Sequence, residues 1–223
     1  DWLLFKDSAV DTVTLNLGGM ANISYIPSSG IRQKVIGFDT GPGMSLIDET
    51  CQLCLGIHMD SKGIKTSEGM INEELLNKLM LHDFINKEYP KSTGRHEFGI
   101  EIVQQAIKQY PKMNIQDLLR TFCMFTAKSI AINLEKYLDI DPLDTRLIIS
   151  GGGIHHQVLM SDLKDNINVV NIEKSDTYGI ESEMKESLLM AVLAVARMQN
   201  IPANMPTVSG ADKPTILGNI FQA

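Results

Sequence analysis

The stretch VIGFDTGPG, residues 35–43, contains a single carboxylate in a setting suited to chemistry. Apolar residues lead into Asp39, and Gly41 and Gly43 follow it closely. A carboxylate at the end of an apolar strand, beside the start of a helix, is favoured as the anion by the helix dipole, so it can accept a proton from water or a hydroxyl. The competing interpretation is a plain turn or N-cap aspartate, which residue type alone favours.

Glycines gather at three positions where predicted strands end, and this pattern favours an anionic ligand. Glycine lets a backbone approach a ligand closely, and free N–H groups at the start of a helix bind phosphate. One cluster alone more often makes only a tight turn, but three in one domain favour a phosphate-bearing ligand beyond the strand ends. Neither GxxxxGK(S/T) nor a GxGxxG after the first strand occurs, which argues against a P-loop and a dinucleotide fold. The predicted phosphate-contacting residues are Gly18, Gly19, Gly41, Gly43, Gly151, Gly152 and Gly153.

Three further polar residues stand near these glycines. Asp48 follows Asp39 by nine residues, and it faces either the same cleft or solvent with about equal weight. His155 and His156 directly follow the triple glycine. They are candidates for acid/base work or ligand contact, and ordinary loop polarity is the alternative, which we favour for His156.

Other reactive side chains have a simpler structural interpretation. Glu181, Glu183 and Glu186 open the last predicted helix, where acidic residues suit the helix dipole in any protein. Cys51 and Cys54 form a CxxC without a second CxxC or clustered histidines, so we expect them to pack as small hydrophobic residues rather than bind zinc.

The elements that must position these residues predict one α/β domain with a mixed sheet and helices on both sides. The first forty residues read as an antiparallel meander with two tight turns, and a wholly apolar strand before the triple glycine suggests burial on both faces. The predicted strands are 11–17, 21–26, 34–38, 147–149 and 169–172. The predicted helices are 45–55, 71–80, a short one near 83, 98–110, 115–138 with Asn114 as N-cap, 158–164 and 182–199.

Composition narrows the class of protein. Of 223 residues, 43% are hydrophobic and 21% charged, as in a packed globular domain. A net charge of −7 and the lack of a basic run argue against a nucleic-acid partner. No apolar stretch is long enough to span a bilayer, and residues 1–6 lack the pattern of a signal peptide. Three cysteines, an odd number, favour a reducing and hence cytoplasmic location.

Taken together, the motifs resemble those of anhydro-N-acetylmuramic acid kinases over nearly the whole chain. Several motifs in the right order make the resemblance specific. They are LNLGGMANIS (15–24), GFDTGPG (37–43), PKSTGR (90–95), FTAKSIA (125–131), SGGGIHHQVLM (150–160), YGIESEMKES (178–187), IPANMPTVSGA (201–211) and ILG (216–218). The resemblance implies the sugar kinase/heat-shock 70/actin fold, in which two ribonuclease H-like lobes enclose ATP.

The resemblance also implies a reaction and roles for particular residues. The family opens the 1,6-anhydro ring of anhydro-N-acetylmuramic acid and phosphorylates O6, using ATP and Mg²⁺, in cell-wall recycling. Asp39 matches the family's base, which activates the attacking water. The Gly18-Gly19 hairpin resembles a phosphate-binding turn, residues 151–153 resemble the adenosine-side loop, and Glu186 matches a sugar-contacting acid. The magnesium ligands stay unassigned, and relatives form homodimers.

Three departures from the family pattern keep alternatives open. Met44 stands where the family usually has Asn, and residues 154–156 read Ile-His-His instead of Ala-His-Asn. Residues 1–223 match a single C-terminal lobe, and the N-terminal lobe of the family has no counterpart in them. We therefore expect little turnover from the isolated chain, because phosphoryl transfer depends on positioning between two walls. The alternatives are an inactive remnant or interaction domain that keeps the fold, and a different kinase of the same superfamily.

Overall fold

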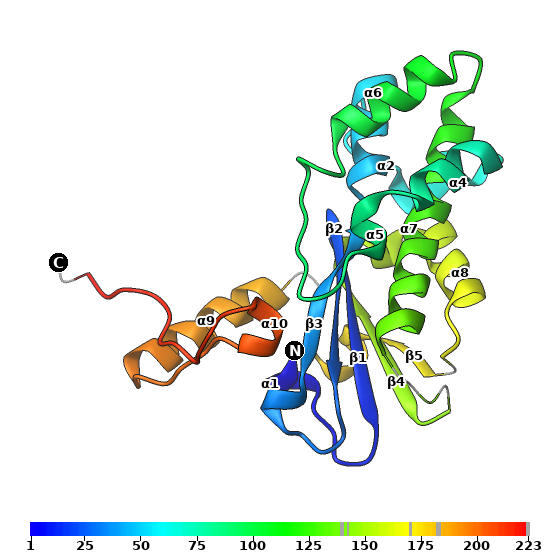
Figure 1. Ribbon diagram of the computed structural model, residues 1–223. Helices are drawn as coiled ribbons and strands as arrows, with labels where there is room; N and C mark the ends of the chain where they lie inside the picture. The colour runs from blue at the N-terminus through cyan, green and yellow to red at the C-terminus, as the bar shows by residue number, and fades with distance from the viewer. Residues whose placement is uncertain (139–140, 142, 170, 182–183, 222–223) are drawn as a thin grey trace.

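A five-stranded mixed sheet forms the centre of the molecule (Figure 1). The computed structural model describes residues 1–223 apart from 139–140, 142, 170, 182–183 and 222–223. Its strands are β1 (Asp11–Leu17), β2 (Met20–Ile26), β3 (Ile36–Pro42), β4 (Thr145–Ser150) and β5 (Asn171–Lys174), in the order β3-β2-β1-β4-β5. The first three strands are antiparallel, whereas β4 runs parallel to both β1 and β5. The predicted α/β class with a mixed sheet is confirmed.

Two strands, β3 and β5, are displaced from the predicted ranges, while β4 is longer than predicted and β2 begins one residue earlier. We expected the third strand to end at Phe38, but β3 continues to Pro42. It is an edge strand, where glycine and proline are tolerated because one side of the strand needs no hydrogen-bond partner. The last strand was predicted at 169–172 and lies at 171–174, with position 170 outside the described residues.

The helices largely follow the predicted segments. They are α1 (Trp2–Phe5), α2 (Ser45–Thr50), α3 (Ile64–Ser67), α4 (Glu73–Met80), α5 (Asp83–Asn86), α6 (Ile100–Gln109), α7 (Ile115–Tyr137), α8 (Gln157–Asn166), α9 (Lys185–Met198) and α10 (Pro206–Ser209). The helix predicted at 45–55 is α-helical only to Thr50 and then continues as a π-helical turn, 51–55, that ends at Gly56. None of the described helices is both long enough and apolar enough to cross a membrane.

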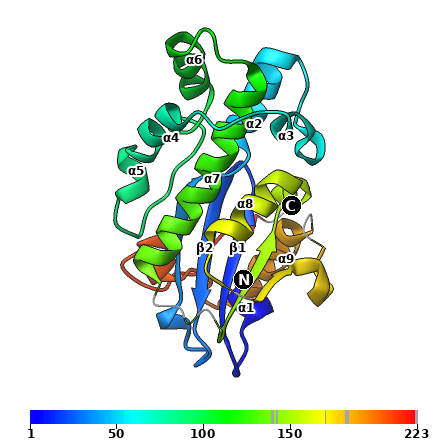
Figure 2. The same ribbon diagram turned by 90° about the vertical axis from the view of Figure 1, so that its right-hand side faces the viewer.

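Helix α7 supplies most of the core on one face of the sheet. Asn114 caps its start as predicted, because the Asn114 side-chain oxygen accepts a hydrogen bond from the Asp117 N–H at 2.7 Å. Its apolar stripe includes the fully buried Phe122 and Phe125. Burial of each such side chain stabilises the folded state by about 1.5–3 kcal/mol relative to leaving it exposed. Figure 2 shows α7 and α8 in front of β1 and β2. These two helices therefore cover one face of the sheet.

A smaller cluster covers the opposite face. Ile26 of β2 and Ile148 of β4 are buried there together with Phe5 of α1. Val208 of α10 packs against this cluster. Because strand side chains alternate between faces, the neighbouring Leu147 and Ile149 belong to the main core instead. The sheet is therefore covered on both sides, as expected.

Helix α9 differs from the others because none of its residues is buried. It extends away from the sheet on the left of Figure 1. Its exposed apolar side chains include Leu189 (50% exposed), Met190 (62%) and Met198 (75%). An apolar helix face this exposed marks a surface that another protein segment can cover.

Candidate functional site

The carboxyl ends of the parallel strands β1 and β4 open into a cavity of about 580 Å³, which we call the glycine cavity. Asn16 lies directly opposite Ser150 in this pair of strands, and loops follow both residues. The cavity is lined by Asn16, Gly18, Gly151, Gly152, Lys185 and Glu186, among others. Glycines from two predicted clusters therefore share one cavity with the predicted sugar-contacting acid. Ligands of open α/β sheets bind at this kind of edge.

The three glycines at 151–153 are not equivalent. Gly151 has a φ of +89°, and a Cβ there would lie 2.7 Å from the carbonyl oxygen of Leu17, so only glycine fits. Gly152 faces open space, with no atom within 4 Å of a would-be Cβ. Gly153 is buried and packs on the Leu17 side chain. The first two glycines thus line the cavity, and the third fits the loop onto β1.

The Gly18-Gly19 hairpin is joined to the start of α2. The carbonyl of Gly18 accepts the N–H of Met44 at 2.8 Å, and that of Gly19 accepts the N–H groups of Gly43 and Ser45 at 2.9 and 3.1 Å. These hydrogen bonds satisfy N–H groups that a helix start would otherwise offer to an anion. The start of α2 is thereby anchored to the hairpin, a role that sequence reasoning did not foresee.

Gly41 and Gly43 lie outside the lining of the glycine cavity. A Cβ on Gly43 would lie 2.3 Å from the Gly18 carbonyl oxygen, so this glycine is needed where α2 meets the hairpin. Gly41 has a φ of +140° and packs against Ile85 and Ser129. Both positions have a packing explanation, and their predicted contact with phosphate stays a prediction.

Asp39 lies in a second cavity of about 540 Å³, which we call the aspartate cavity. Its lining includes Asn22, Asp39, Lys91, Ser92, Val208 and Gly210. Because Asn22 lines both cavities, they adjoin each other. We expected Asp39 to lie at the end of its strand. It lies instead within β3, next to a register shift in the pairing with β2. The Asp39 side chain is half-buried. An irregularity in strand pairing changes the direction in which the neighbouring side chain points.

The Asp39 carboxylate is held through one of its oxygens. The Ser92 hydroxyl donates to Asp39 Oδ2 at 2.9 Å, and the Thr93 backbone N–H donates to the same oxygen at 2.8 Å. Both donors belong to the PKSTGR segment, residues 90–95. Within the described part of the chain, no hydrogen bond or ion pair engages Oδ1. The geometry leaves one carboxylate oxygen available to a ligand or water.

Lys91 is a buried cation beside Asp39, and sequence reasoning missed it. It is 5% exposed, and its Nζ donates to the carbonyls of Phe84 and Ile85 at 3.2 and 3.1 Å. The Nζ also lies 5.0 Å from the ring centre of Phe84, 5.7 Å from that of Phe38 and 5.3 Å from that of Tyr137. Burial, followed by the positive charge of nearby Lys136, lowers the pKa of Lys91 from 10.5 to about 8. The PKSTGR motif was the only sign of this residue in the sequence.

We expect this lysine to make the stability of the protein depend on alkaline pH. In the folded state Lys91 loses its proton near pH 8, whereas in the unfolded chain it keeps the proton to about pH 10.5. Between these values the unfolded state binds more protons, so the free energy of unfolding rises with pH, by at most about 3 kcal/mol from this group. Lys91→Met removes the charge at similar length. Urea titrations at pH 7.5 and 10 should show a smaller pH-dependent gain in this variant than in the parent protein, and an equal gain would contradict the prediction.

Lys185 is the cation of the glycine cavity and also went unnoticed in the sequence. Its Nζ lies 2.7 Å from Asp1 Oδ1 and donates to Ser150 Oγ at 3.0 Å. Burial lowers its pKa from 10.5 to about 8. A cation beside Gly151 suits a cavity that receives an anionic ligand.

Asp48, which we weighed as a possible cleft residue, does not line either cavity. Burial raises its pKa to about 6, although the nearby Arg95 guanidinium opposes this shift. Arg95 forms an ion pair with Glu49 and lies 3.8 Å from a would-be Cβ on Gly19. These charged groups gather beside the hairpin rather than beside Asp39.

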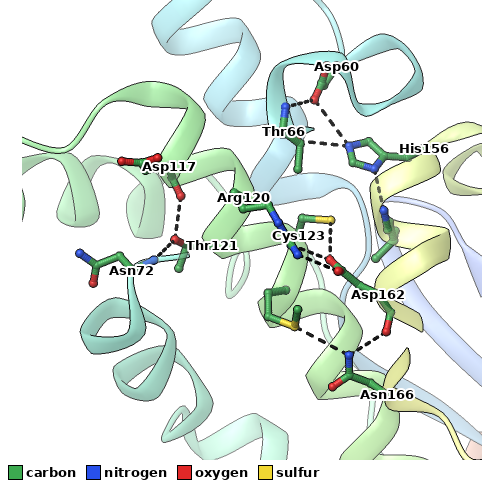
Figure 3. Close-up of polar contacts among 12 residues, drawn as sticks. Asp60, Thr66, Asn72, Asp117, Arg120, Thr121, Cys123, His156, Asp162 and Asn166 are labelled. Atoms are coloured by element: carbon green, nitrogen blue, oxygen red, sulfur yellow. Dashed lines mark hydrogen bonds and ion pairs between the residues drawn. The ribbon is translucent and has the colours of Figure 1, made fainter. Parts of the chain in front are cut away.

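For His156 we favoured the interpretation of an ordinary polar loop residue, and this was wrong. His156 is a buried helix cap (Figure 3). The His156 Nδ1 accepts a hydrogen bond from the Leu159 N–H at 3.1 Å, so the neutral ring carries its proton on Nε2. The Nε2 atom lies 3.3 Å from Thr66 Oγ1 and 3.6 Å from Asp60 Oδ2. Burial tends to raise the pKa of Asp60, but hydrogen bonds from His156, Thr66 and backbone N–H groups outweigh it and lower this pKa to about 2. The network joins the loop before α3 to α8. The adjacent His155 is exposed.

The cysteines are consistent with the packing interpretation. Cys51 is fully buried, and burial raises the pKa of its thiol to about 12. Cys54 is half-buried, and neither cysteine forms a disulfide. Among the described residues there is no group of three His, Cys, Asp or Glu side chains that could hold a metal ion.

The fold and the site define a class of protein. The chain is similar to a solved structure, the activator of the 2-hydroxyisocaproyl-CoA dehydratase from Clostridium difficile with bound ADPNP, with a TM-score of 0.51 and 12% identity over 87% of this chain and 64% of that chain. The chain therefore shares the α/β fold of that solved structure, with a β-meander followed by two parallel strands and a cavity at the ends of those strands.

The sequence comparisons identify the family within this class. The family model described as anhydro-N-acetylmuramic acid kinase matches residues 1–223, and the chain belongs to this family. It is 36% identical over 222 residues to the anhydro-N-acetylmuramic acid kinase of Bacillus cereus (strain AH187), covering 98% of this chain and 58% of that protein. It is also 36% identical over 220 residues to that of Clostridioides difficile (strain 630), covering 99% of this chain and 57% of that protein. The chain thus spans little more than half the length of these relatives.

Proposed function

We propose that this chain is the C-terminal lobe of an ATP-dependent kinase that opens 1,6-anhydro-N-acetylmuramic acid and phosphorylates its O6. One observation carries the proposal: the cavity that holds Asp39 adjoins the cavity lined by Gly18, Gly151 and Gly152. A base and a phosphate-binding wall must lie side by side if one reaction is to combine ring opening with phosphoryl transfer. The family membership supports the same conclusion.

The proposed reaction uses Asp39 as a general base. Water loses a proton to the Asp39 carboxylate as its oxygen bonds to the anomeric carbon of the sugar, and the bond from that carbon to O6 breaks. O6 then bonds to the γ-phosphorus of ATP, whose bond to the bridging oxygen breaks to release ADP. Glu186 lines the neighbouring cavity and would contact the sugar. The products are N-acetylmuramic acid 6-phosphate and ADP.

The glycine cavity suits the nucleotide. Gly152 leaves open space, and a phosphate would have to compete with Asp1 for the Lys185 ammonium. Gly18 would face the phosphates from the cavity wall, with Gly19 next to it in the hairpin but outside the lining, and residues 151–153 would face the adenosine. Mg²⁺ neutralises phosphate charge in such reactions, and with no carboxylate cluster among the described residues we expect phosphates and water to hold it largely.

A second lobe would complete the site. The exposed apolar face of α9 begins beside the glycine cavity, since Leu188 and Leu189 line that cavity. Covering this face would bury apolar surface and close the cavity against water. We propose that the part of the family outside the matched length supplies this cover. As ATP is a cytoplasmic substrate, we place the protein in the cytoplasm, and the homodimer of the family stays a prediction.

A domain that keeps the fold without turnover is the alternative, and Met44 favours it. The Met44 sulfur would lie 3.3 Å from a Cβ on Gly153. A thioether cannot replace the hydrogen bonds of the amide that the family usually has at this position. Loss of these hydrogen bonds next to the nucleotide loop would weaken substrate positioning.

Nucleotide binding tests the proposal in the chain as it stands. Titration calorimetry with ADP and Mg²⁺ should give a saturable heat, and Gly152→Leu should remove it because a side chain would fill the open space beside the loop. Ser161→Leu, at an exposed position on α8, is the matched control and should bind like the parent. Absence of heat from the folded parent protein would count against the nucleotide site.

Turnover tests the reaction. With ATP, Mg²⁺ and 1,6-anhydro-N-acetylmuramic acid, we expect little ADP release from the chain alone and restored release when the remaining segment of the Bacillus cereus relative is added as a separate lobe. Robust release by the chain alone would refute the need for a second lobe. Binding of nucleotide without turnover in either preparation would support the non-catalytic alternative.

A further inference from the structure

The loop at residues 90–95 meets the Asp39 strand at both backbone and side chain. The Asp39 N–H donates to the Lys91 carbonyl at 3.1 Å, while Ser92 and Thr93 donate to Asp39 Oδ2. Two donors on one oxygen fix the rotation of a carboxylate about its Cβ–Cγ bond, and hydrogen bonds to an ionised acceptor are roughly twice as strong as neutral ones. The orientation of the other oxygen, Oδ1, is thereby fixed as well.

Contacts of Lys91, Thr93 and the preceding residue Tyr89 anchor this loop. The Lys91 side chain is buried among three aromatic rings and bonds two carbonyls of α5. The Tyr89 ring stacks on the Phe38 ring, with centroids 5.5 Å apart and planes 12° from parallel. On the other side, the Thr93 hydroxyl donates to Glu97 Oε2 at 2.6 Å. The donors to Asp39 thus belong to a segment held on both sides.

We propose that Ser92 and the Thr93 N–H are positioning groups that hold Asp39 by Oδ2 so that Oδ1 takes the proton of the attacking water, with Lys91 as the buried anchor of their loop. The inference rests on the proposed function, because it assumes that Asp39 is the base. Catalysis by a positioned base is sensitive to misplacement of about 1 Å. If the Asp39 carboxylate were free to rotate, the reaction rate would fall more than the affinity for substrate. No other role for the Ser92 hydroxyl is apparent from its contacts in the described residues.

Amide hydrogen exchange tests the contact itself in the 223-residue chain, without any assumption about activity. The Thr93 N–H is expected to exchange at least about 10-fold faster in Asp39→Ala than in the parent, because its acceptor is gone. Asp165→Ala, at an exposed position on α8, is the control and should leave the exchange unchanged. Lys91→Met should also speed exchange at Thr93 by releasing the loop. Equal exchange in Asp39→Ala and the parent would overturn the proposal.

Kinetics test the consequence in whichever preparation turns over. Ser92→Ala is expected to lower kcat by about 10- to 100-fold and to change KM by less than about twofold, since a charge-assisted hydrogen bond is lost from the base and not from the substrate. Ser92→Thr keeps the hydroxyl and should recover most of the rate. A rise in KM with kcat unchanged would mean that Ser92 contacts substrate instead, and would overturn the positioning role. Activity that survives Asp39→Asn would refute the base and hence the proposed function, a result distinct from either outcome at Ser92.

Discussion

In the chain combined with the remaining lobe, replacing Asp39 by Asn is expected to lower kcat by at least about 100-fold and to leave the affinity for ADP within about twofold of the parent. An amide keeps the shape of the carboxylate and can still accept hydrogen bonds from Ser92 and Thr93 through its oxygen, so the cavity persists. It cannot take a proton from water at neutral pH, and a positioned general base contributes about 10²- to 10⁴-fold. Affinity should persist because the proposed nucleotide site is the adjoining glycine cavity, which Asp39 does not line.

The measurement combines a coupled assay of ADP release with calorimetry on the same preparations. Asp165→Asn makes the same chemical change at an exposed position on α8 and should match the parent in both. Loss of ADP binding in Asp39→Asn would show that the two cavities do not act separately. Full activity in this variant would exclude Asp39 as the base.

The largest loss of stability is expected from Asp162→Ala. Arg120 of α7 and Asp162 of α8 form a two-pronged ion pair, with Nη1–Oδ2 and Nη2–Oδ1 distances of 2.6 and 2.7 Å (Figure 3). Both side chains are largely buried, and the Cys123 thiol also donates to the carboxylate. Removing one partner leaves a buried guanidinium without its counter-charge, which costs about 3–5 kcal/mol. The melting temperature of a domain of this size should then fall by roughly 6–20 °C.

Two controls separate the lost charge from the lost volume and from ordinary ion pairing. Glu88→Ala removes an exposed partner of Lys136 and should cost less than about 1 kcal/mol. The double variant Arg120→Met with Asp162→Leu replaces the pair by apolar side chains and should recover much of the stability, because no unpaired charge remains. Thermal and urea unfolding followed by circular dichroism give the comparison. A small effect of Asp162→Ala would mean that water reaches Arg120 in the folded protein.

Much of the fold follows from local patterns in the sequence. Alternating apolar residues with glycine turns predicted the three-strand meander, and Asn114 before a long apolar stripe predicted the start of α7. The triple glycine after the fourth predicted strand indicated a turn that can reach positive φ, and Gly151 has a φ of +89°. Such features depend on residues close in the chain, so a single sequence reveals them.

Other features depend on contacts between distant segments. The extension of β3 to Pro42 follows from its place at the sheet edge, which no local pattern gives. His156 became a buried cap because Asp60, about a hundred residues earlier, lies against it. The anchoring of Lys91 likewise needs Phe38 and Tyr137 from two other elements.

The sequence by itself determined the α/β class, the family and the candidate Asp39, because motif order and hydrophobic periodicity are properties of the chain alone. Only the tertiary structure decided that the cavity of Asp39 adjoins the cavity of Gly18, Gly151 and Gly152, and that Gly41 and Gly43 take packing positions. The physical reason is that a side chain's surroundings come from the strands and loops that pack around it, and those lie up to more than a hundred residues away along the chain.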